Sequence, residues 1–237
     1  MKAAILAAGI GNRLKPITDK TPKPLIRVGG RTILERMLGS LVEEGIKDIC
    51  IVTGHLKEQI KDFAGKEYKG AKIKYLVNPD YRLGSILSLY TAREEFAGED
   101  TLLMDADVIF EHRVLKTLVD SKHENCFLID KNFEDSGEEM KIASLDKRVV
   151  QVARKITREH DEVGEGVGFM KISPACHGQL SNALERRICL NNVCDYEMAL
   201  DDFVKNAQTG FEDITGMRWT EVDFPEDIAK AESLGLR

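Results

Sequence analysis

The chain of 237 residues is 43% hydrophobic and 31% charged, which is typical of a folded protein with a sizeable core. Its 34 lysines and arginines against 40 aspartates and glutamates give a net charge of −6, which argues against nucleic-acid binding because no domain-wide basic face is available. No apolar run reaches the length of a transmembrane helix and the N-terminus has the pattern of a strand, so we expect a cytoplasmic protein with no membrane partner.

The first half of the chain alternates regularly between strand and helix patterns. Residues 3–8 predict a buried strand, and a long loop follows over residues 9–31. Thr32 and Glu35 have the spacing of a capping box at the start of the first helix, and Gly45 is suited to its end. This alternation predicts a parallel, doubly wound sheet. The elements expected after the loop are a helix at 32–45, a strand at 48–54, a helix at 56–63, a strand at 72–78, a helix at 85–96 and a strand at 101–110.

The alternation is less regular in the second half, where no linker or repeat marks a domain boundary. We therefore expect this half to extend the same sheet, and the fold class to be α/β, a Rossmann-like three-layer sandwich with a mostly parallel mixed sheet. The elements expected are a helix at 114–120, a strand at 125–130, an antiparallel pair at 141–146 and 149–156 joined at residues 147 and 148, a strand at 167–173, helices at 174–188 and 196–207, short stretches at 211–215 and 217–224, and a helix from Pro225.

The loop over residues 9–31 carries six lysines or arginines and one acid in a chain that is acidic overall. Leu14 stands where the dinucleotide-binding fingerprint has its third glycine, and no GK[ST] follows, so neither of the two best-known glycine loops matches. Arg13 and Lys23, the latter between two prolines, could instead neutralise a triphosphate from two sides. The alternative is an ordinary tight turn in a solvated basic loop.

Carboxylates occur where two of the expected strands end. Strand alternation places Asp105 and Asp107 on one face, at the edge of the sheet where ligands bind in such folds. Asp223 precedes the helix from Pro225, and Glu221 shares its strand parity. Simpler roles exist for these aspartates, because Asp often bonds its own backbone in turns and often caps helices.

The segment LAAGIGNRLKPITDKTPKPLIRVGGRTIL resembles the signature of the nucleotidyltransferases that make NDP-sugars and CDP-alcohols. The resemblance returns in WTEVDFPEDIAKAE near the C-terminus and is strongest to phosphocholine-type cytidylyltransferases. It implies an enzyme that joins a nucleoside triphosphate to a phosphorylated acceptor and releases pyrophosphate. It also implies a single glycosyltransferase-A-like domain over residues 1–237, with a nucleotide-binding half at 1–110 and an acceptor-binding half at 111–237.

The resemblance assigns roles to particular residues. Arg13 and Lys23 would be catalytic, and Asp107 and Asp223 would hold Mg²⁺, which prefers one or two carboxylates together with phosphate oxygens and water. The nucleotide would contact Leu6, Ala7, Ala8, Gly9, Gly11, Asn12, Arg13, Lys23, Gly84, Ser85 and Asp105. The acceptor would contact Lys141, Lys155, Glu165 and Glu197.

Several alternatives stay open at this stage. Ser85 could be a helix N-cap and Lys155 a solvated lysine at a strand end. The pattern Ser88-Leu89-Tyr90 favours CTP, with UTP, dTTP or GTP and a sugar 1-phosphate as the alternative. A non-catalytic nucleotide sensor on the same fold is the alternative of another class.

The expected reaction is CMP transfer to a phosphorylated small alcohol. The acceptor is left open among phosphocholine, an aminoalkyl phosphate or phosphonate, an inositol phosphate and a sugar phosphate, and a homodimer is left open as well. An NAD-dependent oxidoreductase is disfavoured by Leu14 and by the length of the loop.

Overall fold

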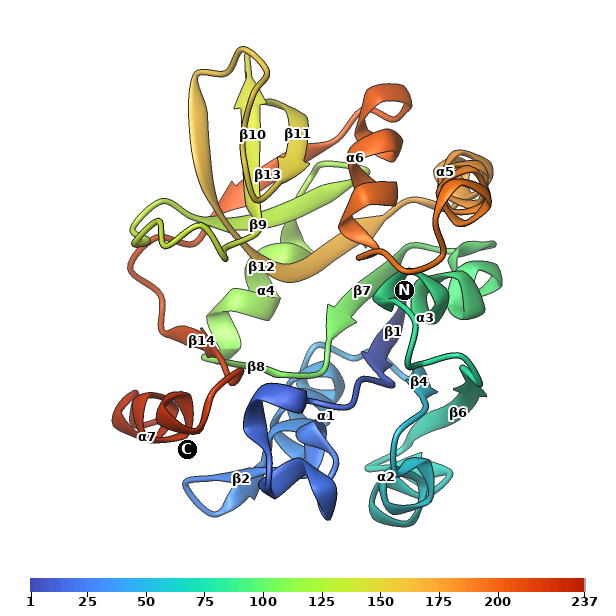
Figure 1. Ribbon diagram of the computed structural model, residues 1–237, viewed down its shortest axis with the longest axis vertical. Helices are drawn as coiled ribbons and strands as arrows, with labels where there is room; N and C mark the ends of the chain where they lie inside the picture. Colours follow the sequence, from blue (N-terminus) through green and yellow to red (C-terminus); the bar gives the residue numbers. More distant parts are fainter. Residues whose placement is uncertain (237) are drawn as a thin grey trace.

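The predicted first strand, β1 (Lys2–Ala7), lies in the middle of a ten-stranded sheet. It pairs in parallel with β4 (Asp48–Thr53) on one side and with β7 (Thr101–Asp105) on the other, and β6 (Ala71–Val77) continues the parallel set beyond β4. The computed structural model, which describes residues 1–236, thus confirms the parallel sheet expected for the first half (Figure 1).

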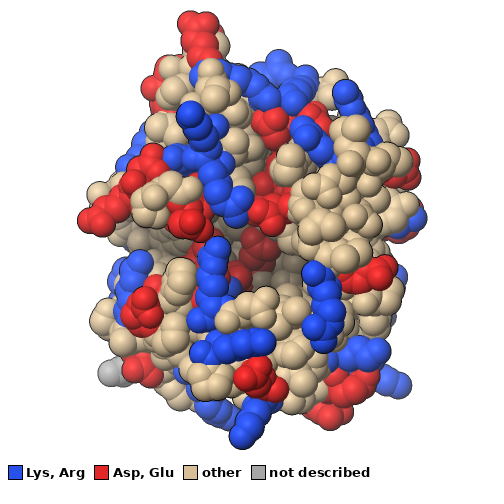
Figure 2. Space-filling model, in the orientation of Figure 1, with Lys and Arg blue, Asp and Glu red and all other residues tan. Residues whose placement is uncertain are grey.

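Strands of the second half extend this sheet. The long strand β12 (Glu162–Ile172) runs antiparallel to β7, so the sheet is mixed, as expected. A hollow crosses the face of the molecule that is drawn in Figure 2. The remaining strands of the sheet are β5 (Glu67–Tyr68), β9 (Cys126–Asp130), β10 (Lys141–Leu145), β11 (Arg148–Ala153) and β13 (Gly210–Asp213).

Helices cover both faces of the sheet, which confirms the three-layer sandwich. Side chains alternate along β1, so that Ala3 and Ile5 pack in one core and Ala4 packs in the other. The first core includes α1 (Ile33–Glu43), α2 (Lys57–Ala64) and α4 (His112–Asp120). The second core includes α3 (Ser85–Ala92), α5 (His177–Leu190) and α6 (Glu197–Asn206).

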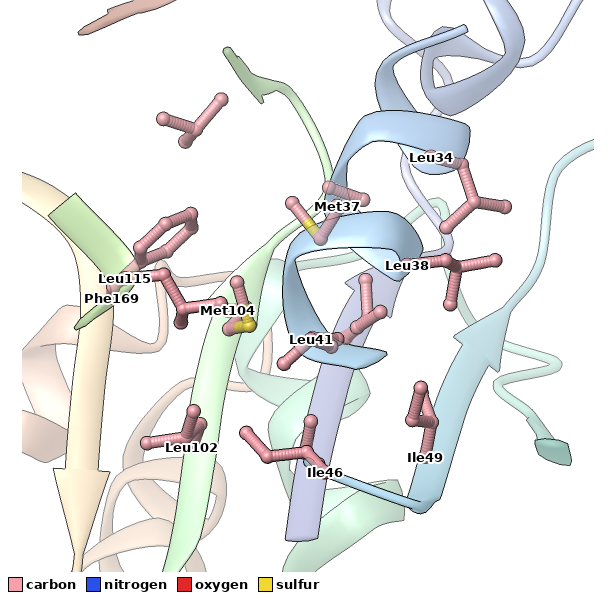
Figure 3. Close-up of a cluster of buried hydrophobic side chains, with 14 of the residues drawn as sticks. Leu34, Met37, Leu38, Leu41, Ile46, Ile49, Leu102, Met104, Leu115 and Phe169 are labelled. Carbon is pink, nitrogen blue, oxygen red and sulfur yellow. The ribbon is translucent and has the colours of Figure 1, made fainter. Parts of the chain in front are cut away.

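Helix α1 shows how the sequence specifies this packing. Leu34, Leu38 and Leu41 recur at helical spacing and lie fully buried against the sheet (Figure 3). The Thr32 side chain accepts a hydrogen bond of 3.0 Å from the backbone N–H of Glu35, as the capping pattern predicts. Gly45, with φ of +74°, follows the helix in the left-handed conformation that glycine adopts without strain.

The strand expected over residues 101–110 is wrong in one respect that matters for the site. β7 ends at Asp105, the chain turns at residues 106 and 107, and β8 (Val108–Phe110) leaves the sheet to pair with β14 (Trp219–Glu221). The apolar run continues through β8 because that strand is buried too, against a different partner. Asp105 and Asp107 therefore do not share a strand face.

Other boundaries differ by less. The hairpin between β10 and β11 turns at Asp146 and Lys147, one residue earlier than expected, and both adopt positive φ. The helix expected at 85–96 ends in a 3₁₀ turn (Arg93–Phe96), and the helix expected at 174–188 begins with another (Pro174–Cys176). Within residues 1–236, no helix combines the length and the apolar character that a membrane span requires.

The long basic loop is ordered by three 3₁₀ turns and by contact with the C-terminal helix. A short hairpin of β2 (Arg27–Val28) and β3 (Arg31–Thr32) ends it, and α7 (Pro225–Ser233) lies beside that hairpin (Figure 1). Both ends of the chain thereby contribute to one small core. Its buried members are Leu14, Ile26, Val28, Ile33, Ile109, Val222 and Ala231.

Candidate active site

A lysine and two aspartates from three distant segments meet in the hollow. The Nζ of Lys23 lies 2.6 Å from Oδ2 of Asp107 and 2.5 Å from Oδ1 of Asp223. Lys23 comes from the basic loop, Asp107 from the turn after β7, and Asp223 from the segment between β14 and α7. Three of the four residues predicted to be catalytic or to hold Mg²⁺ thus meet, with Lys23 in contact with both aspartates, and we call them the Lys23 cluster.

The charge of Lys23 is firmly held. Its side chain is only 13% exposed, and burial alone would lower the pKa of its ammonium. Asp107 and Asp223 outweigh that effect, so the pKa stays well above its ordinary value. Lys23 is therefore a fixed positive charge between two carboxylates at neutral pH.

Asp223 is not the cap of helix α7, which was the simpler role considered for it. Asp227 caps the helix instead, since its Oδ2 accepts hydrogen bonds of 2.9 Å and 2.8 Å from the backbone N–H groups of Asp223 and Phe224. Both carboxylate oxygens of Asp223 are thereby left to contact cations, Oδ1 with Lys23 and Oδ2 with Arg13.

Arg13 lies at the rim of the cluster with its side chain about half exposed. Its guanidinium lies 3.2 Å from Asp223, 3.3 Å from Glu138 and 5.3 Å from the centre of the Phe224 ring. Arg13 thus reaches across the hollow, from the basic loop to residues of the second half. Such exposed ion pairs are weak, so a phosphate could replace the carboxylates as its partner.

Gly11 sets the shape of the loop that carries both basic residues. Its φ is +68°, and a Cβ at this position would lie 2.9 Å from Cγ2 of Thr18. The buried Thr18 hydroxyl donates a 2.7 Å hydrogen bond to the carbonyl of Gly11, and His55 Nε2 lies 2.8 Å from the Thr18 carbonyl. These contacts fold the loop back on itself, which brings Lys23 beneath the end of β1.

The predicted nucleotide residues at the start of the chain lie together. Leu6 and Ala7 end β1, and Ala8, Gly9, Gly11 and Asn12 follow at the carboxyl edge of the parallel strands, next to the Lys23 cluster. Gly84 is the N-cap of α3, so Ser85 is the first helical residue and not the cap. The Ser85 hydroxyl instead accepts a 2.9 Å hydrogen bond from the backbone N–H of Tyr196. Contact of these residues with a nucleotide stays a prediction.

Asp105 faces away from the Lys23 cluster. The Tyr196 hydroxyl lies 2.6 Å from its Oδ2, and Gly168 approaches so closely that a Cβ there would lie 2.6 Å from the same oxygen. Burial, with a further contribution from Asp107, raises the pKa of Asp105 well above its ordinary value. Asp105 therefore lies on the second-half side of the site.

An acidic cavity of about 560 Å³ adjoins the cluster, between Arg13 and Asp223 on one side and strand β12 on the other. Acidic side chains are visible in the hollow of Figure 2, with lysines and arginines around its rim. Among the described residues, two cations line the cavity, Arg13 and Lys230. Its carboxylates are Asp130, Glu134, Glu138, Glu139, Glu165, Glu221, Asp223 and Asp227.

The four residues predicted to contact the acceptor are in different surroundings. Glu165 lines the acidic cavity, and burial raises its pKa to about 7, with Glu139 and Asp130 adding to the shift and Lys230 opposing it. Glu197 lies near Asp105, and burial raises its pKa to about 7 as well. Its Oε2 is buried without a hydrogen-bond partner among the described residues.

The two lysines do not line the cavity. Lys141 is buried and its ammonium lies 2.5 Å from Asp135, and Lys155 is exposed in the bend after β11. Their predicted contact with the acceptor phosphate stays untested, and the arrangement gives it no geometric support.

Asp130 belongs to the site but is not among the residues predicted from the sequence, and its partner in the site is Trp219. The Trp219 Nε1 donates a 2.8 Å hydrogen bond to Asp130, and both residues line the acidic cavity. Asp130 ends a predicted strand, as Asp105 does, so its position at a strand end was a usable signal. Asp227 lies in the first turn of α7, where acids are common, and its capping contact leaves both carboxylate oxygens of Asp223 free for cations.

The sequence and the fold match known proteins. Residues 2–129 match the family described as Nucleotidyl transferase. A CMP-5′-(3-aminopropyl)phosphonate synthase of Streptomyces rubellomurinus is 42% identical over 118 residues, which are 50% of this chain and 19% of that protein. A choline-phosphate cytidylyltransferase of Streptococcus pneumoniae is 28% identical over 238 residues, which cover 99% of this chain and 98% of that protein.

The structure of an inositol-1-phosphate CTP transferase from T. maritima has a TM-score of 0.80 at 19% identity and covers 98% of this chain and 94% of that one, which shows the shared fold. The chain spans about half the length, or less, of three of the curated relatives that it matches. Because the family match covers more than half of the chain, the protein belongs to the nucleotidyl transferase family.

Proposed function

We propose that the protein is a metal-dependent cytidylyltransferase, which transfers CMP from CTP to a phosphorylated or phosphonylated small alcohol and releases pyrophosphate. The observation that carries the proposal is the Lys23 cluster, in which one buried cation and two carboxylates converge beside the glycine-containing loop. Nucleotidyl transfer needs this combination, because it brings together two groups that already carry negative charge.

In the proposed reaction, an oxygen of the acceptor phosphate attacks the α-phosphorus of CTP. A new P–O bond forms there, and the bond between the α-phosphorus and the oxygen that bridges to the β-phosphorus breaks. The acceptor oxygen is already ionised at neutral pH, so no general base is required. Catalysis then depends on positioning and on charge neutralisation.

Lys23 and Arg13 supply the positive charge from the chain itself. Lys23 is buried and stays charged, so its ammonium can stabilise negative charge near the α-phosphorus. Arg13 is more exposed and lies between the basic loop and the acidic cavity, so it is placed to contact phosphate oxygens.

Asp107 and Asp223 fit Mg²⁺. Both carboxylates already contact one cation, the ammonium of Lys23, which shows that the position between them accommodates positive charge. Two carboxylates, with water and phosphate oxygens as the other ligands, are a donor set that Mg²⁺ prefers. When bound, the ion would act as a Lewis acid toward the phosphate oxygens. Lys23 must shift from at least one carboxylate to admit it.

Two further observations support CTP as the nucleotide. The relatives named above include proteins described as a CMP-transferring synthase and a cytidylyltransferase. The Ser88-Leu89-Tyr90 segment lies in α3, one helical turn after the Gly84-Ser85 pair predicted to contact the nucleotide. Ser88 itself is buried and accepts a 3.0 Å hydrogen bond from Asn78, which fixes the start of this helix.

A pyrophosphate-release assay tests the proposal. CTP, UTP, dTTP and GTP are each combined with phosphocholine, O-phosphoethanolamine, 2-aminoethylphosphonate, inositol 1-phosphate or glucose 1-phosphate, with and without MgCl₂. We expect release with CTP and one of the small-alcohol phosphates or phosphonates, and none after chelation with EDTA.

Three results would contradict this assignment. Preferred turnover of UTP, dTTP or GTP with glucose 1-phosphate would identify a sugar-phosphate enzyme. Nucleotide binding without Mg²⁺ and without turnover of any pair would identify a sensor. Turnover that persists in EDTA would remove the metal from the mechanism.

A further inference from the structure

The acidic cavity contains more negative charge than the proposed transfer of CMP requires. Eight carboxylates line it against two cations, and one of those cations, Arg13, is shared with the Lys23 cluster. A triphosphate and an acceptor phosphate would both be repelled by such a surface. The excess must therefore serve either the structure or a positively charged ligand.

Most of these carboxylates have structural partners. Asp130 accepts hydrogen bonds from Trp219 and from the backbone of Asn132. Glu139 accepts bonds from Ser136 and from the backbone N–H of Gly137, which closes the loop before β10. Asp227 caps α7, and Glu138 pairs with Arg13. These groups shape the cavity and are already satisfied.

Glu134, Glu165 and Glu221 have no such partner among the described residues. Glu134 is exposed and Glu221 lies near the charges of the Lys23 cluster, which leaves Glu165 as the unpaired carboxylate away from that cluster. The Glu165 side chain makes no hydrogen bond or ion pair with any described residue, although it is partly buried on β12 between β9 and β10. The nearby carboxylates of Glu139 and Asp130 repel its charge, and with burial they raise its pKa to about 7. A carboxylate left without a partner in such a place destabilises the fold, which is typical of a group that awaits a ligand.

The chemistry around Glu165 favours a cation that can donate hydrogen bonds. A quaternary ammonium binds to the faces of aromatic rings, and three aromatic residues line the cavity: Phe133, Trp219 and Phe224. The guanidinium of Arg13 already lies over the Phe224 ring, 5.3 Å from its centre. A protonated primary amine instead needs oxygen acceptors, and a free carboxylate supplies a strong one.

We propose that the acceptor is a zwitterion, with a phosphate or phosphonate at one end and a protonated primary amine at the other, and that Glu165 receives the amine. The inference rests on the proposed function and names the substrate class of the same site. Arg13 and Glu165 both line the cavity, so a small molecule that carries one charge of each sign finds complementary charges within it. Glu165 is then the residue that determines acceptor specificity.

Matched acceptors test this assignment with CTP and Mg²⁺. O-Phosphoethanolamine and 2-hydroxyethyl phosphate differ only in an ammonium against a hydroxyl, and phosphocholine carries three methyl groups on the nitrogen. We expect kcat/KM for the amine to exceed that for the hydroxyl analogue by about 10- to 100-fold, because a charged hydrogen bond is lost. Phosphocholine should be turned over more slowly than O-phosphoethanolamine.

Two variants locate the effect. Glu165→Gln should raise KM for O-phosphoethanolamine about 10- to 100-fold and leave the kinetics with 2-hydroxyethyl phosphate unchanged, so that the preference for the amine is lost. Glu134→Gln is the matched control, because Glu134 lines the same cavity but is exposed. It removes the same charge and should keep the preference.

The outcomes separate this inference from the proposed function. Equal kcat/KM for O-phosphoethanolamine and 2-hydroxyethyl phosphate would overturn the role of Glu165. So would a Glu165→Gln variant whose activity falls equally with both acceptors. Faster turnover of phosphocholine than of O-phosphoethanolamine would contradict the inference that the acceptor carries a primary amine. In all these cases CTP is still consumed, so the proposed function stands. If CTP is consumed with none of the acceptors, the proposed function itself fails.

Discussion

The Lys23 cluster and the region of the acidic cavity around Glu165, which we call the first and second ends of the cleft, differ in how their charges are neutralised. At the Lys23 cluster, two carboxylates share a cation that the chain itself provides. In the acidic cavity, Glu165 makes no ion pair with any described residue, and Glu139 and Asp130 repel its charge while Lys230 only partly offsets them. The first end is organised before any ligand arrives, which suits a reaction that depends on preformed electrostatics. The second end is completed only by a ligand, which suits selection of an acceptor.

The largest effect on turnover should follow from removing the Lys23 side chain at the first end. Lys23→Ala removes the buried cation, and we expect turnover to fall about 10³-fold, because the charge that stabilises the transferring phosphate is lost. Steady-state pyrophosphate release measures this loss. Lys20→Ala, in the same loop but with an exposed side chain, is the control and should be close to wild type.

The same variant should change metal binding in the opposite direction. Without Lys23, Mg²⁺ no longer competes with an ammonium for Asp107 and Asp223, so it should bind more tightly in the absence of nucleotide. Titration calorimetry and the rise in Tm on adding MgCl₂ both report this change. Weaker Mg²⁺ binding by Lys23→Ala than by wild type would show that the two carboxylates do not form the metal site.

The two carboxylates of the first end should act as one unit. Asp107→Asn and Asp223→Asn should each lower turnover about 10²-fold, and the double variant should be little worse than either, because both residues serve the same cation. Asp120→Asn, at the exposed end of α4, is a control for the loss of an aspartate. Losses that multiply in the double variant would mean that the aspartates have separate roles.

The regular part of the fold could be predicted because its signals are local. Each parallel strand is a short apolar run, and helix α1 carries its own cap and its own stop in Thr32 and Gly45. The turn after Asp105 was only an alternative from the sequence, because the apolar pattern that Asp105 and Asp107 interrupt resumes at Val108, as it would within a single strand. The chain leaves the sheet there because β8 pairs with β14, which lies more than a hundred residues later.

The site divides in the same way. Lys23, Asp107 and Asp223 could be found from their motifs, but their mutual contact depends on the packing of three distant segments. Lys141 was predicted to contact the acceptor phosphate, but its ammonium forms an ion pair with Asp135. Asp135 lies in a loop whose sequence has no pattern that predicts this contact. Glu165 could be predicted as an unusual acid, whereas its lack of a partner is a property of the folded cavity.

A smaller effect should arise where the two halves meet. A Cβ at Gly84 would lie 2.5 Å from the carbonyl oxygen of Cys194, and this oxygen belongs to a backbone that cannot easily move. Gly84→Ala should therefore destabilise the protein by about 1–3 kcal/mol, seen as a lower urea midpoint.

Gly39→Ala provides the opposite case. Gly39 lies in α1 with open space around it, so alanine there should stabilise the fold by up to about 1 kcal/mol. An unchanged midpoint for Gly84→Ala would show that the contact between α3 and the segment before α6 is loose.

A further effect concerns the pH dependence of stability at the second end. Glu165 has a pKa of about 7 in the folded protein, whereas the unfolded chain ionises it near its ordinary value of about 4.3. The folded state therefore binds the proton more tightly, so this residue reduces stability as the pH rises from about 4.3 to 7. Glu165→Gln removes that loss. Its Tm should equal that of wild type at pH 4 and exceed it at pH 8, while Glu134→Gln should show no such divergence. A Glu165→Gln variant that is less stable than wild type at pH 8 would mean that the carboxylate has a stabilising partner in the free protein, and the contrast between the two ends of the cleft would no longer hold.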